Sequence, residues 1–206
     1  MTDTRQRLID AATRVFAEQG VETASLLEVA RRAGQRNRGA VHYHFGSRAG
    51  VLVAVLEQYA GFLADREGEL LRAAEQARDT LLTPVVEAVV RPAVELAETG
   101  WRGRCYLVVV AELAESDQEA MDPEVAAALA RTGGYAVYDL LTRRMPPMDG
   151  PLRTERLSLL TGFVLRSVAD RARAVERGQG RAQLDTDAFT ANLVAMASGM
   201  LAAPTP

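Results

Sequence analysis

The feature that most constrains this chain is a helical spacing of apolar residues, repeated along its length and interrupted by capping residues, glycines and prolines. In residues 4–19, Leu8, Ala12, Val15 and Phe16 recur at i, i+4, i+7 and i+8, which places them on one face of a helix. The glycine that follows directly ends this segment. The alternation of apolar and polar residues that is typical of strands is not found in the 206 residues. We therefore predict an all-α fold.

The rest of the chain divides into further helices at recognisable start signals. Ser25 followed by Glu28 is a capping box, in which the hydroxyl and the carboxylate each accept a hydrogen bond from an unpaired backbone N–H group. Asp122-Pro123 places a cap before a proline in the first turn. Residues 105–111 form an apolar run that also suits a strand, but the residues after it extend it to helix length. The helices predicted after residues 4–19 span about 25–34, 37–45, 47–74, 83–99, 105–115, 123–145, 152–177 and 185–203.

Composition and charge narrow the class of protein. A single cysteine excludes an internal disulfide framework, and no apolar run approaches the roughly 18 residues of a membrane span, so we expect a cytoplasmic protein with no membrane partner. Residues 1–50 hold eight arginines against five acids, whereas residues 51–206 hold sixteen arginines against twenty-two acids. A basic N-terminal segment on an acidic remainder favours a nucleic-acid partner, although an excess of three charges also arises by chance.

Three short helices before a long one indicate a helix-turn-helix domain, whose last short helix enters the major groove of DNA. Residues 4–48, which read TRQRLIDAATRVFAEQGVETASLLEVARRAG…RGAVHYHFGSR, resemble the N-terminal domain of the tetracycline-repressor (TetR) family of bacterial regulators. The matching features are AA…F…G in the first helix, S-x-x-E-V-A in the second and YHF-x-S at the end of the third. The resemblance implies a DNA-binding helix-turn-helix domain at 1–48 and a helical effector-binding and dimerisation domain at 49–206.

Two positions depart from the family pattern. The family turn has two residues after Ala-Gly, whereas here Gln35, Arg36 and Asn37 supply three. With Asn37 as the N-cap of the third helix, the extra residue places Arg36 beside the DNA. Gly50 stands where a glutamate would complete a capping box with Ser47, so we expect the fourth helix to fray at its start.

Position within the helix-turn-helix domain predicts DNA roles. Arg38, in the first turn of the recognition helix, is expected to donate two hydrogen bonds to guanine O6 and N7, which is worth ~1–3 kcal/mol of discrimination. Gly39 and Ala40 allow close backbone approach, and Ala40 is expected to reach a thymine methyl group. Tyr43 and His44 resemble the family's phosphate-contacting pair, while a place in the core is the alternative for His44. The full predicted set is Thr23, Ser25, Arg36, Asn37, Arg38, Gly39, Ala40, His42, Tyr43, His44, Ser47 and Arg48.

Residues that flank the recognition helix are expected to hold the DNA backbone. Arg48 and the helix amides at Ser47 form a predicted phosphate clamp. Thr23 and Ser25 are placed to donate to a phosphate, although Ser25 is first a helix cap. Inward packing against the first helix is assigned to Val41 and Phe45.

The last two helices carry apolar or small residues on two sides, which requires two neighbours for each. Packing within one subunit is one explanation. The family resemblance implies instead that these helices pair with their two-fold mates in a four-helix bundle. The chain is then a homodimer that reads an inverted repeat in double-stranded DNA, with recognition helices ~34–36 Å apart. The predicted interface residues are Leu157, Leu160, Val164, Val168, Ala188, Ala191, Ala195, Ser198 and Ala202.

The resemblance also implies an effector cavity among the middle helices, filled by an unidentified small molecule. In the family mechanism the ligand favours a body conformation in which the DNA-binding domains are wrongly spaced for the operator. Ordinary core packing is the alternative for each aromatic residue and methionine. The predicted lining is Phe62, Trp101, Cys105, Tyr106, Val109, Met121, Tyr135, Tyr138 and Phe163, with Arg91, Arg166 and Glu112 as polar anchors. Pro92, which should bend its helix, and the glycines 133–134 are expected to lend flexibility there.

Catalysis and metal binding find no support in the sequence. No nucleophile–base pair, phosphate loop or metal-ligand spacing is visible, so we expect no enzyme, no cofactor and no metal. Cys105 lies in an apolar run that disfavours a thiolate, and His42 and His44, two residues apart on a helix, point to opposite sides. The sequence therefore predicts an effector-responsive transcriptional regulator, usually a repressor. The alternative is a small-molecule binding protein whose DNA-binding domain no longer reads an operator.

Overall fold

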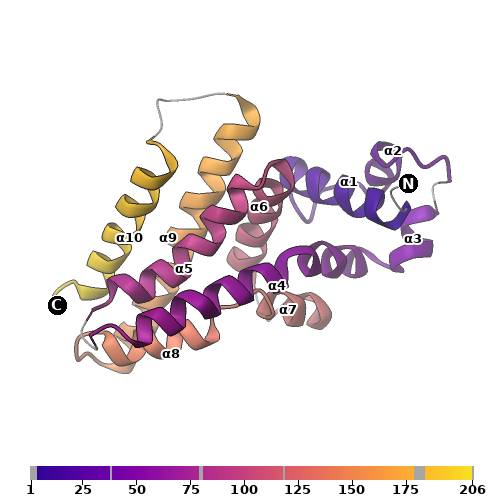
Figure 1. Cartoon of the computed structure of the whole chain (residues 1–206). Coiled ribbons are helices and arrows are strands. Elements are labelled where there is room, and N and C mark those ends of the chain that lie inside the picture. Colours follow the sequence, from indigo (N-terminus) through magenta and orange to yellow (C-terminus); the bar gives the residue numbers. More distant parts are fainter. Residues whose placement is uncertain (1–3, 38, 79–80, 118, 179–183, 206) are drawn as a thin grey trace.

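The chain forms a bundle of helices in the computed structural model, which describes residues 4–37, 39–78, 81–117, 119–178 and 184–205 (Figure 1). These residues contain no strand, and the predicted all-α fold is confirmed. The helices are α1 (Thr4–Gln19), α2 (Leu26–Arg32), α3 (Ala40–Phe45), α4 (Arg48–Glu75), α5 (Thr83–Glu98), α6 (Trp101–Glu115), α7 (Pro123–Ala130), α8 (Tyr135–Arg144), α9 (Gly150–Arg177) and α10 (Thr186–Ala202).

The first three helices form one end of the molecule, here called the head, and α4 to α10 form the body (Figure 1). The long helix α4 leaves the head and runs along the body, where it packs against α5 and α7. In the body, α6 packs on α9, and α10 packs on α5 and α9. Helix α1 packs against both α4 and α6. The head is therefore held on the body by two helices.

One apolar core runs through both parts. It includes Leu8 of α1, Val55 of α4 and Leu201 of α10, each with no exposed surface. Full burial of a side chain of this size contributes roughly 1.5–3 kcal/mol, so the shared core ties the head to the body. The predicted inward residue Val41 of α3 is buried in the same core, and Phe45 packs against it.

Most helix starts follow the capping signals of the sequence. Ser25 Oγ accepts a hydrogen bond from Glu28 N at 3.4 Å, and Asp122 Oδ1 accepts one from Glu124 N at 2.9 Å. Helix α5 continues through Pro92, which is buried. These caps explain why the order and number of the early helices are readable from sequence.

Three predicted helices have clearly different boundaries, and the one expected at 105–115 begins earlier, at Trp101. The segment 123–145 was expected to be one helix, but Gly133 and Gly134 have φ of +112° and +107° and separate α7 from α8. The third helix was expected to begin at Asn37 and begins at Ala40. Left-handed backbone is easily adopted by glycine alone, so consecutive glycines end a helix here.

The start of α4 differs from its expectation for a steric reason. Ser47 Oγ accepts a hydrogen bond from Gly50 N at 3.1 Å, and the backbone is helical from Arg48 onward, so the expected fraying is not observed. A Cβ atom added to Gly50 would lie 2.0 Å from the Phe45 carbonyl oxygen at the end of α3. Glycine is therefore required at this position by the close approach of α3 to α4.

Replacement of Gly50 by alanine tests this constraint. We expect Gly50→Ala to lower the free energy of unfolding by about 1–3 kcal/mol, because the added methyl group displaces the α3–α4 turn. Gly61→Ala is the matched control on the same helix, where nothing lies within 4 Å of the added atom. It should raise stability by about 0.5–1 kcal/mol, since alanine is the better helix former. Urea unfolding measures both, and equal effects of the two substitutions would contradict the account.

Candidate functional site

The turn before α3 is organised by Asn37. Its Oδ1 accepts a hydrogen bond from Gly39 N at 2.8 Å, and the residue at the N-cap of α3 is Gly39. The expectation that Asn37 caps the third helix is therefore wrong, because its side chain closes a turn onto the backbone two residues later. Arg36 is exposed in this turn, and Arg38 lies outside the described residues.

Helix α3 presents one face to solvent. Tyr43 is 85% exposed, and its ring meets the His44 ring edge to face, with centroids 5.1 Å apart. His42 is exposed and His44 is partly buried. Ala40 is only 7% exposed and belongs to the core, so the predicted contact of its side chain with a thymine methyl group is wrong. The outward face is thus formed by His42 and Tyr43.

The hydroxyl residues near α2 and α4 are engaged in helix ends. Thr23 donates a hydrogen bond to the Gln19 carbonyl oxygen at the end of α1. Ser25 and Ser47 accept the capping bonds described above, and all three side chains lie on exposed residues. Their use as caps leaves the hydroxyl hydrogens of Ser25 and Ser47 available to an acceptor such as a phosphate oxygen.

Arg48 serves a different purpose from the predicted phosphate clamp. Its guanidinium donates to the carbonyl oxygens of Val21 and Ala24, both at 2.7 Å, and lies 6.0 Å from the Phe16 ring centroid. Two short bonds to the turn between α1 and α2 use one N–H group on each terminal nitrogen and direct the guanidinium into the head. Arg48 therefore holds the head together, and the part of the predicted clamp that stays a prediction is the helix amides at Ser47.

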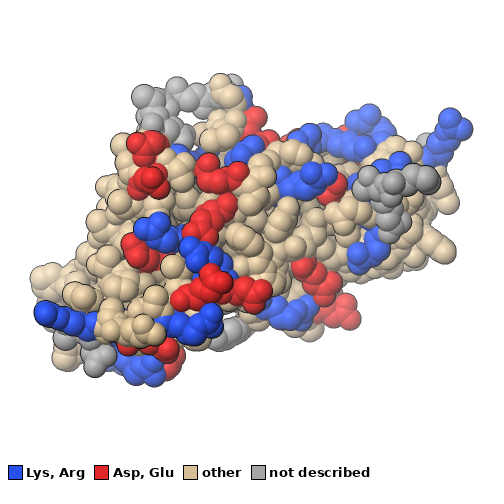
Figure 2. All heavy atoms as spheres, in the orientation of Figure 1, with Lys and Arg blue, Asp and Glu red and all other residues tan. Residues whose placement is uncertain are grey.

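Positive side chains gather on the head, as Figure 2 shows at the right of the view. Several are already paired: Glu28 accepts bonds from Arg31 at 2.7 Å and from Arg32 at 2.8 Å. These hydrogen bonds, first from Arg31 and then from Arg32, lower the pKa of Glu28 to about 2. The Glu28 carboxylate is thereby used by arginines, so the predicted reciprocal capping box with Ser25 is formed on the hydroxyl side only.

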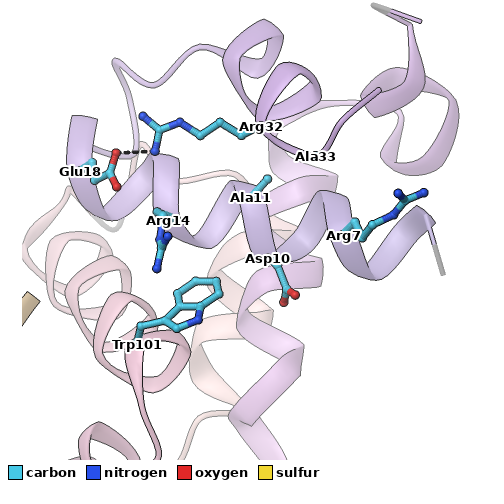
Figure 3. A pocket seen from close by; sticks show the side chains of 8 residues that line it. All are labelled: Arg7, Asp10, Ala11, Arg14, Glu18, Arg32, Ala33 and Trp101. Carbon is cyan, nitrogen blue, oxygen red and sulfur yellow. Dashed lines mark hydrogen bonds and ion pairs between the residues drawn. The ribbon is translucent and has the colours of Figure 1, made fainter. Parts of the chain in front are cut away.

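A groove of about 430 Å³ lies on the head beside the start of α6, lined by α1, the end of α2 and Trp101 (Figure 3). Trp101 of α6 lies under Arg14, whose guanidinium carbon is 4.1 Å from the ring centroid, and beside Asp10. Asp10 pairs with Arg102 at 2.6 Å. Burial alone would raise the pKa of Asp10, but hydrogen bonds from Arg102 and Gln6 outweigh it and lower that pKa.

A second link joins α6 to the head. The Glu112 carboxylate accepts a hydrogen bond from Val21 N at 2.7 Å, in the turn between α1 and α2. Trp101 and Glu112 were predicted to line the effector cavity. Both instead lie where α6 meets the head, Trp101 against Arg14 and Glu112 against Val21 N. The prediction that they line the cavity is therefore wrong.

The body contains a cavity of about 390 Å³ that is lined by helices α4, α5, α6, α7, α8 and α9. Its walls are mostly aliphatic, and its polar side chains are those of Glu67, Thr132, Tyr138 and Thr161. The apolar and glycine lining residues are Leu63, Val89, Pro92, Ala93, Leu107, Val110, Ala114, Ala126, Leu129, Ala130, Gly133, Gly134, Val164 and Leu165. Such a volume and lining are typical of small-molecule sites.

Glu67 is the charged group in this lining. Its Oε1 accepts a hydrogen bond from Gly134 N at 2.8 Å. Burial raises the pKa of Glu67 above its usual value, against the opposing effect of that hydrogen bond. Tyr138 and Thr161 hydrogen bond to each other across the same wall.

Of the predicted ligand residues whose side chains the structure describes, Tyr138 alone lines this cavity. Tyr106 and Val109 are fully buried core residues, and the Tyr106 hydroxyl donates to the Leu56 carbonyl oxygen at 3.0 Å. Phe62 is 40% exposed on the outside of α4. Cys105 is buried, and burial raises the pKa of its thiol to about 11.

The remaining predicted ligand residues lie elsewhere. Arg91 pairs with Glu87, and Arg166 pairs with Asp170 on the exposed side of α9. Met121 and Phe163 pack partly buried against the core, outside the cavity lining. The Tyr135 side chain is outside the described part of the chain. Sequence analysis missed Glu67, although the glycines 133–134 that seat its carboxylate were noted.

The predicted interface residues divide between core and surface. Leu160, Val164 and Val168 of α9 are at most 2% exposed, and Leu157 packs against the core, so they face the subunit interior rather than a partner. On α10, three predicted residues are exposed and two are partly buried. The exposed ones are Ala191, Ala195 and Ala202, and the partly buried ones are Ala188 and Ser198. Leu159 of α9 and Met196 of α10 are 53% and 50% exposed.

Neither a metal-binding cluster nor a membrane-spanning helix occurs among the described residues. No group of three His, Cys, Asp or Glu side chains there is arranged to hold a metal ion. No helix in that part of the chain has the length and apolar content to cross a membrane.

The role of Arg48 is testable by separating stability from DNA affinity. We expect Arg48→Ala to cost roughly 1.5–3 kcal/mol of unfolding free energy, because two carbonyl oxygens lose a charged donor. Arg36→Ala, at an exposed residue of the same head, should stay within about 0.5 kcal/mol of the parent. Thermal unfolding and binding to random-sequence duplex DNA are measured together. If Arg48→Ala keeps the stability of the parent but binds DNA more weakly, the result would support the prediction that Arg48 holds a phosphate.

Comparison with known proteins adds two family matches. Residues 8–55 match the model of bacterial regulatory proteins of the tetR family, and residues 87–200 match the tetracyclin repressor-like C-terminal domain. The regulator SrpR of Pseudomonas putida is 56% identical over 54 residues, 26% of this chain and 25% of that protein. BetI of Rhizobium meliloti is 35% identical over 75 residues, 36% of each chain. The matched segment thus spans about a quarter to a third of these relatives.

Solved structures extend the likeness to the whole fold. The crystal structure of AibR in complex with isovaleryl coenzyme A and operator DNA has a TM-score of 0.63 at 15% identity, over 98% of this chain and 100% of that one. KstR2 of Mycobacterium tuberculosis has a TM-score of 0.63 at 17% identity, over 99% and 97%. Because the C-terminal family model alone covers more than half of the chain, this protein belongs to the TetR family of bacterial regulatory proteins.

Proposed function

We propose that this chain is a repressor that binds an inverted-repeat operator as a homodimer and releases it when a small molecule fills the body cavity. Membership of the family makes it a DNA-binding transcriptional regulator, and its named relatives are regulators rather than enzymes. The observation that carries the proposal is α3, a short helix with Ala40 and Val41 in the core and Tyr43 85% exposed. A regulator of this kind acts in the cytoplasm, where the DNA is.

The outward side of α3 and its turn would meet the DNA. Tyr43 and His42 project from the helix, and the exposed Arg36 precedes it. In this proposal the tyrosine hydroxyl and the histidines donate to phosphates, and Arg38 reads a guanine edge in the major groove. The hydroxyls of Ser25 and Ser47 add contacts to the DNA backbone that fix the register without reading sequence, whereas the Thr23 hydroxyl is bonded to the Gln19 carbonyl oxygen.

Dimerisation is supported by the outer surface of α9 and α10. Apolar Leu159 and Met196 are half exposed, and the small residues Ala191 and Ala195 share the exposed side of α10. Small side chains allow a second helix to approach closely, and a two-fold pairing of α9 and α10 buries both apolar residues. The two copies of α3 would then enter successive major grooves ~34–36 Å apart.

Helix α6 supports a route from the cavity to the head. Leu107 and Val110 of α6 line the cavity, while Arg102 and Glu112 of the same helix bond to the head. A ligand that shifts α6 therefore shifts the head, by as much as its preference for that state allows. The neighbour AibR was solved with both a small molecule and operator DNA, which fits a fold that serves both.

Selection of bound fragments from a random duplex library tests the proposal. The purified chain is expected to enrich an inverted repeat whose half-sites lie one helical turn apart. Enrichment of a single half-site would contradict the proposal that the chain binds DNA as a dimer. No enrichment, in a protein that still binds small molecules, would favour the alternative in which the lengthened turn at Gln35–Asn37 has removed operator reading.

The exposed ring of Tyr43 gives the first mutational test. Tyr43→Ala should weaken binding to the selected operator by roughly tenfold or more, because a hydrogen bond to a charged phosphate is lost. Its thermal stability should not change, since the ring is exposed. Phe62→Ala, a half-exposed aromatic residue on the body, is the control and should bind as the parent does. Fluorescence anisotropy with labelled operator measures both, and equal affinity of all three proteins would remove Tyr43 as a phosphate contact.

A charge placed on α10 tests the dimer. Ala195→Glu should weaken self-association by roughly 3–5 kcal/mol, because it buries an unpaired carboxylate between two helices. Ala73→Glu, at an exposed alanine of α4, should leave association unchanged. Analytical ultracentrifugation distinguishes the two. A dimer of undiminished affinity in Ala195→Glu would place the interface on another surface.

A further inference from the structure

Among the described residues, one polar group in the cavity wall, the Glu67 carboxylate, has hydrogen-bonding capacity that the protein uses only in part. Thr132 Oγ1 donates to the Leu129 carbonyl oxygen at 2.7 Å, and Tyr138 and Thr161 bond each other. A carboxylate has room for about four hydrogen bonds. In the part of the chain that the structure describes, Glu67 has one donor, Gly134 N. The strongest acceptor in the wall therefore retains capacity for a ligand.

The charge of Glu67 is also uncompensated. The neighbouring Arg66 is bonded to Glu95 at 2.7 Å and to Glu69 at 2.8 Å, and Arg131 is bonded to Glu57. Within the described residues no arginine lines the cavity. A partly buried carboxylate without a counter-charge is costly, and a bound cation removes that cost.

The two glycines between α7 and α8 make room for the Glu67 carboxylate. A Cβ atom on Gly133 would lie 2.8 Å from Glu67 Oε2 and 3.1 Å from its carboxyl carbon. Gly133 and Gly134 both have positive φ, which turns Gly134 N toward Oε1. A side chain at position 133 would displace the carboxylate. The double glycine thus serves both to separate α7 from α8 and to hold the Glu67 carboxylate in the wall.

We propose that the cavity takes a compact, largely apolar molecule with one cationic nitrogen, and that this nitrogen pairs with Glu67. The aliphatic walls bury the apolar body, and a charged N–H group donates to the carboxylate in a charge-assisted hydrogen bond. An anionic ligand would face Glu67 with no arginine in the described lining to offset it. The inference rests on the proposed function only in taking this cavity as the effector site.

Matched probes that differ in charge alone test the proposal by isothermal titration calorimetry on the full chain. Each set shares one apolar body: phenylbutylamine, phenylbutanol and phenylbutyrate; decylamine, decanol and decanoate; adamantylamine, adamantanol and adamantanecarboxylate. In at least one set the amine should bind roughly tenfold or more tightly than the alcohol and the carboxylate. Preference for an alcohol or a carboxylate, or the absence of binding by all three amines, overturns the proposal.

Substitution of Glu67 tests whether its carboxylate is the group that causes the preference for the amine. Glu67→Gln keeps an oxygen for Gly134 N but removes the charge, so the amine should lose its roughly tenfold advantage while the alcohol binds within about twofold of the parent. Glu69→Gln, on the exposed side of the same helix, is the control and should retain the advantage. An amine preference that survives Glu67→Gln overturns the assignment. If that variant does not fold, the parent's ratios of amine to alcohol affinity decide the proposal.

Operator binding measured on the same samples separates the two proposals. A cavity that prefers alcohols or carboxylates and still controls the operator overturns this inference and leaves the proposed function standing. A chain that never prefers one duplex over another overturns the proposed function, while calorimetry still decides whether the amine pairs with Glu67.

Discussion

The contact between α6 and the head is the interaction on which the rest of the arrangement depends. Glu112 accepts a hydrogen bond from Val21 N, and Arg102 pairs with Asp10, so one body helix holds both the first helix and the turn after it. Arg48 bonds to the carbonyl oxygen of the same Val21 from the start of α4. The turn between α1 and α2 is therefore clamped from two body helices. The orientation in which Tyr43 meets solvent follows from this clamp and from the apolar core shared by α1, α3 and α4.

Helix α6 also connects the body cavity to the head. Because α6 lines the cavity along one part and holds the head along another, a change in its position acts on both. The links to the head are charged and lie near the surface, whereas the cavity wall is aliphatic. The ion pair between Arg102 and Asp10 is partly exposed and of a kind worth about 0–1 kcal/mol, whereas the bond from Val21 N to the Glu112 carboxylate is a charge-assisted hydrogen bond. In the proposed function, a ligand that shifts α6 acts on the head through these two links.

The fold was predictable from sequence because local signals determine it. Ser25, Ser47 and Asp122 cap helices within a few residues, and the spacing of Leu8, Val15 and Phe16 marks a buried face without knowledge of any partner. The site was less predictable because its residues are brought together across the chain. Glu67 reads as an ordinary charge on an amphipathic helix until Gly134, 67 residues later, donates to it. Arg48 reads as a phosphate ligand until two carbonyl oxygens are found beside it. The apolar residues Leu160, Val164 and Val168 of α9 suit a subunit core and a dimer interface equally well. Their spacing in the sequence therefore did not distinguish the two.

The distance between the two heads of a dimer tests the central claim most directly. A spin label at position 36 (Arg36→Cys in a Cys105→Ser background) reports that distance by pulsed electron paramagnetic resonance. The account predicts a narrow distribution in the free protein, which broadens when Asp10→Ala and Glu112→Ala remove the bonds to α6. A distribution equally broad with and without these bonds, or no distance between subunits at all, would contradict the claim that α6 sets the orientation of the head.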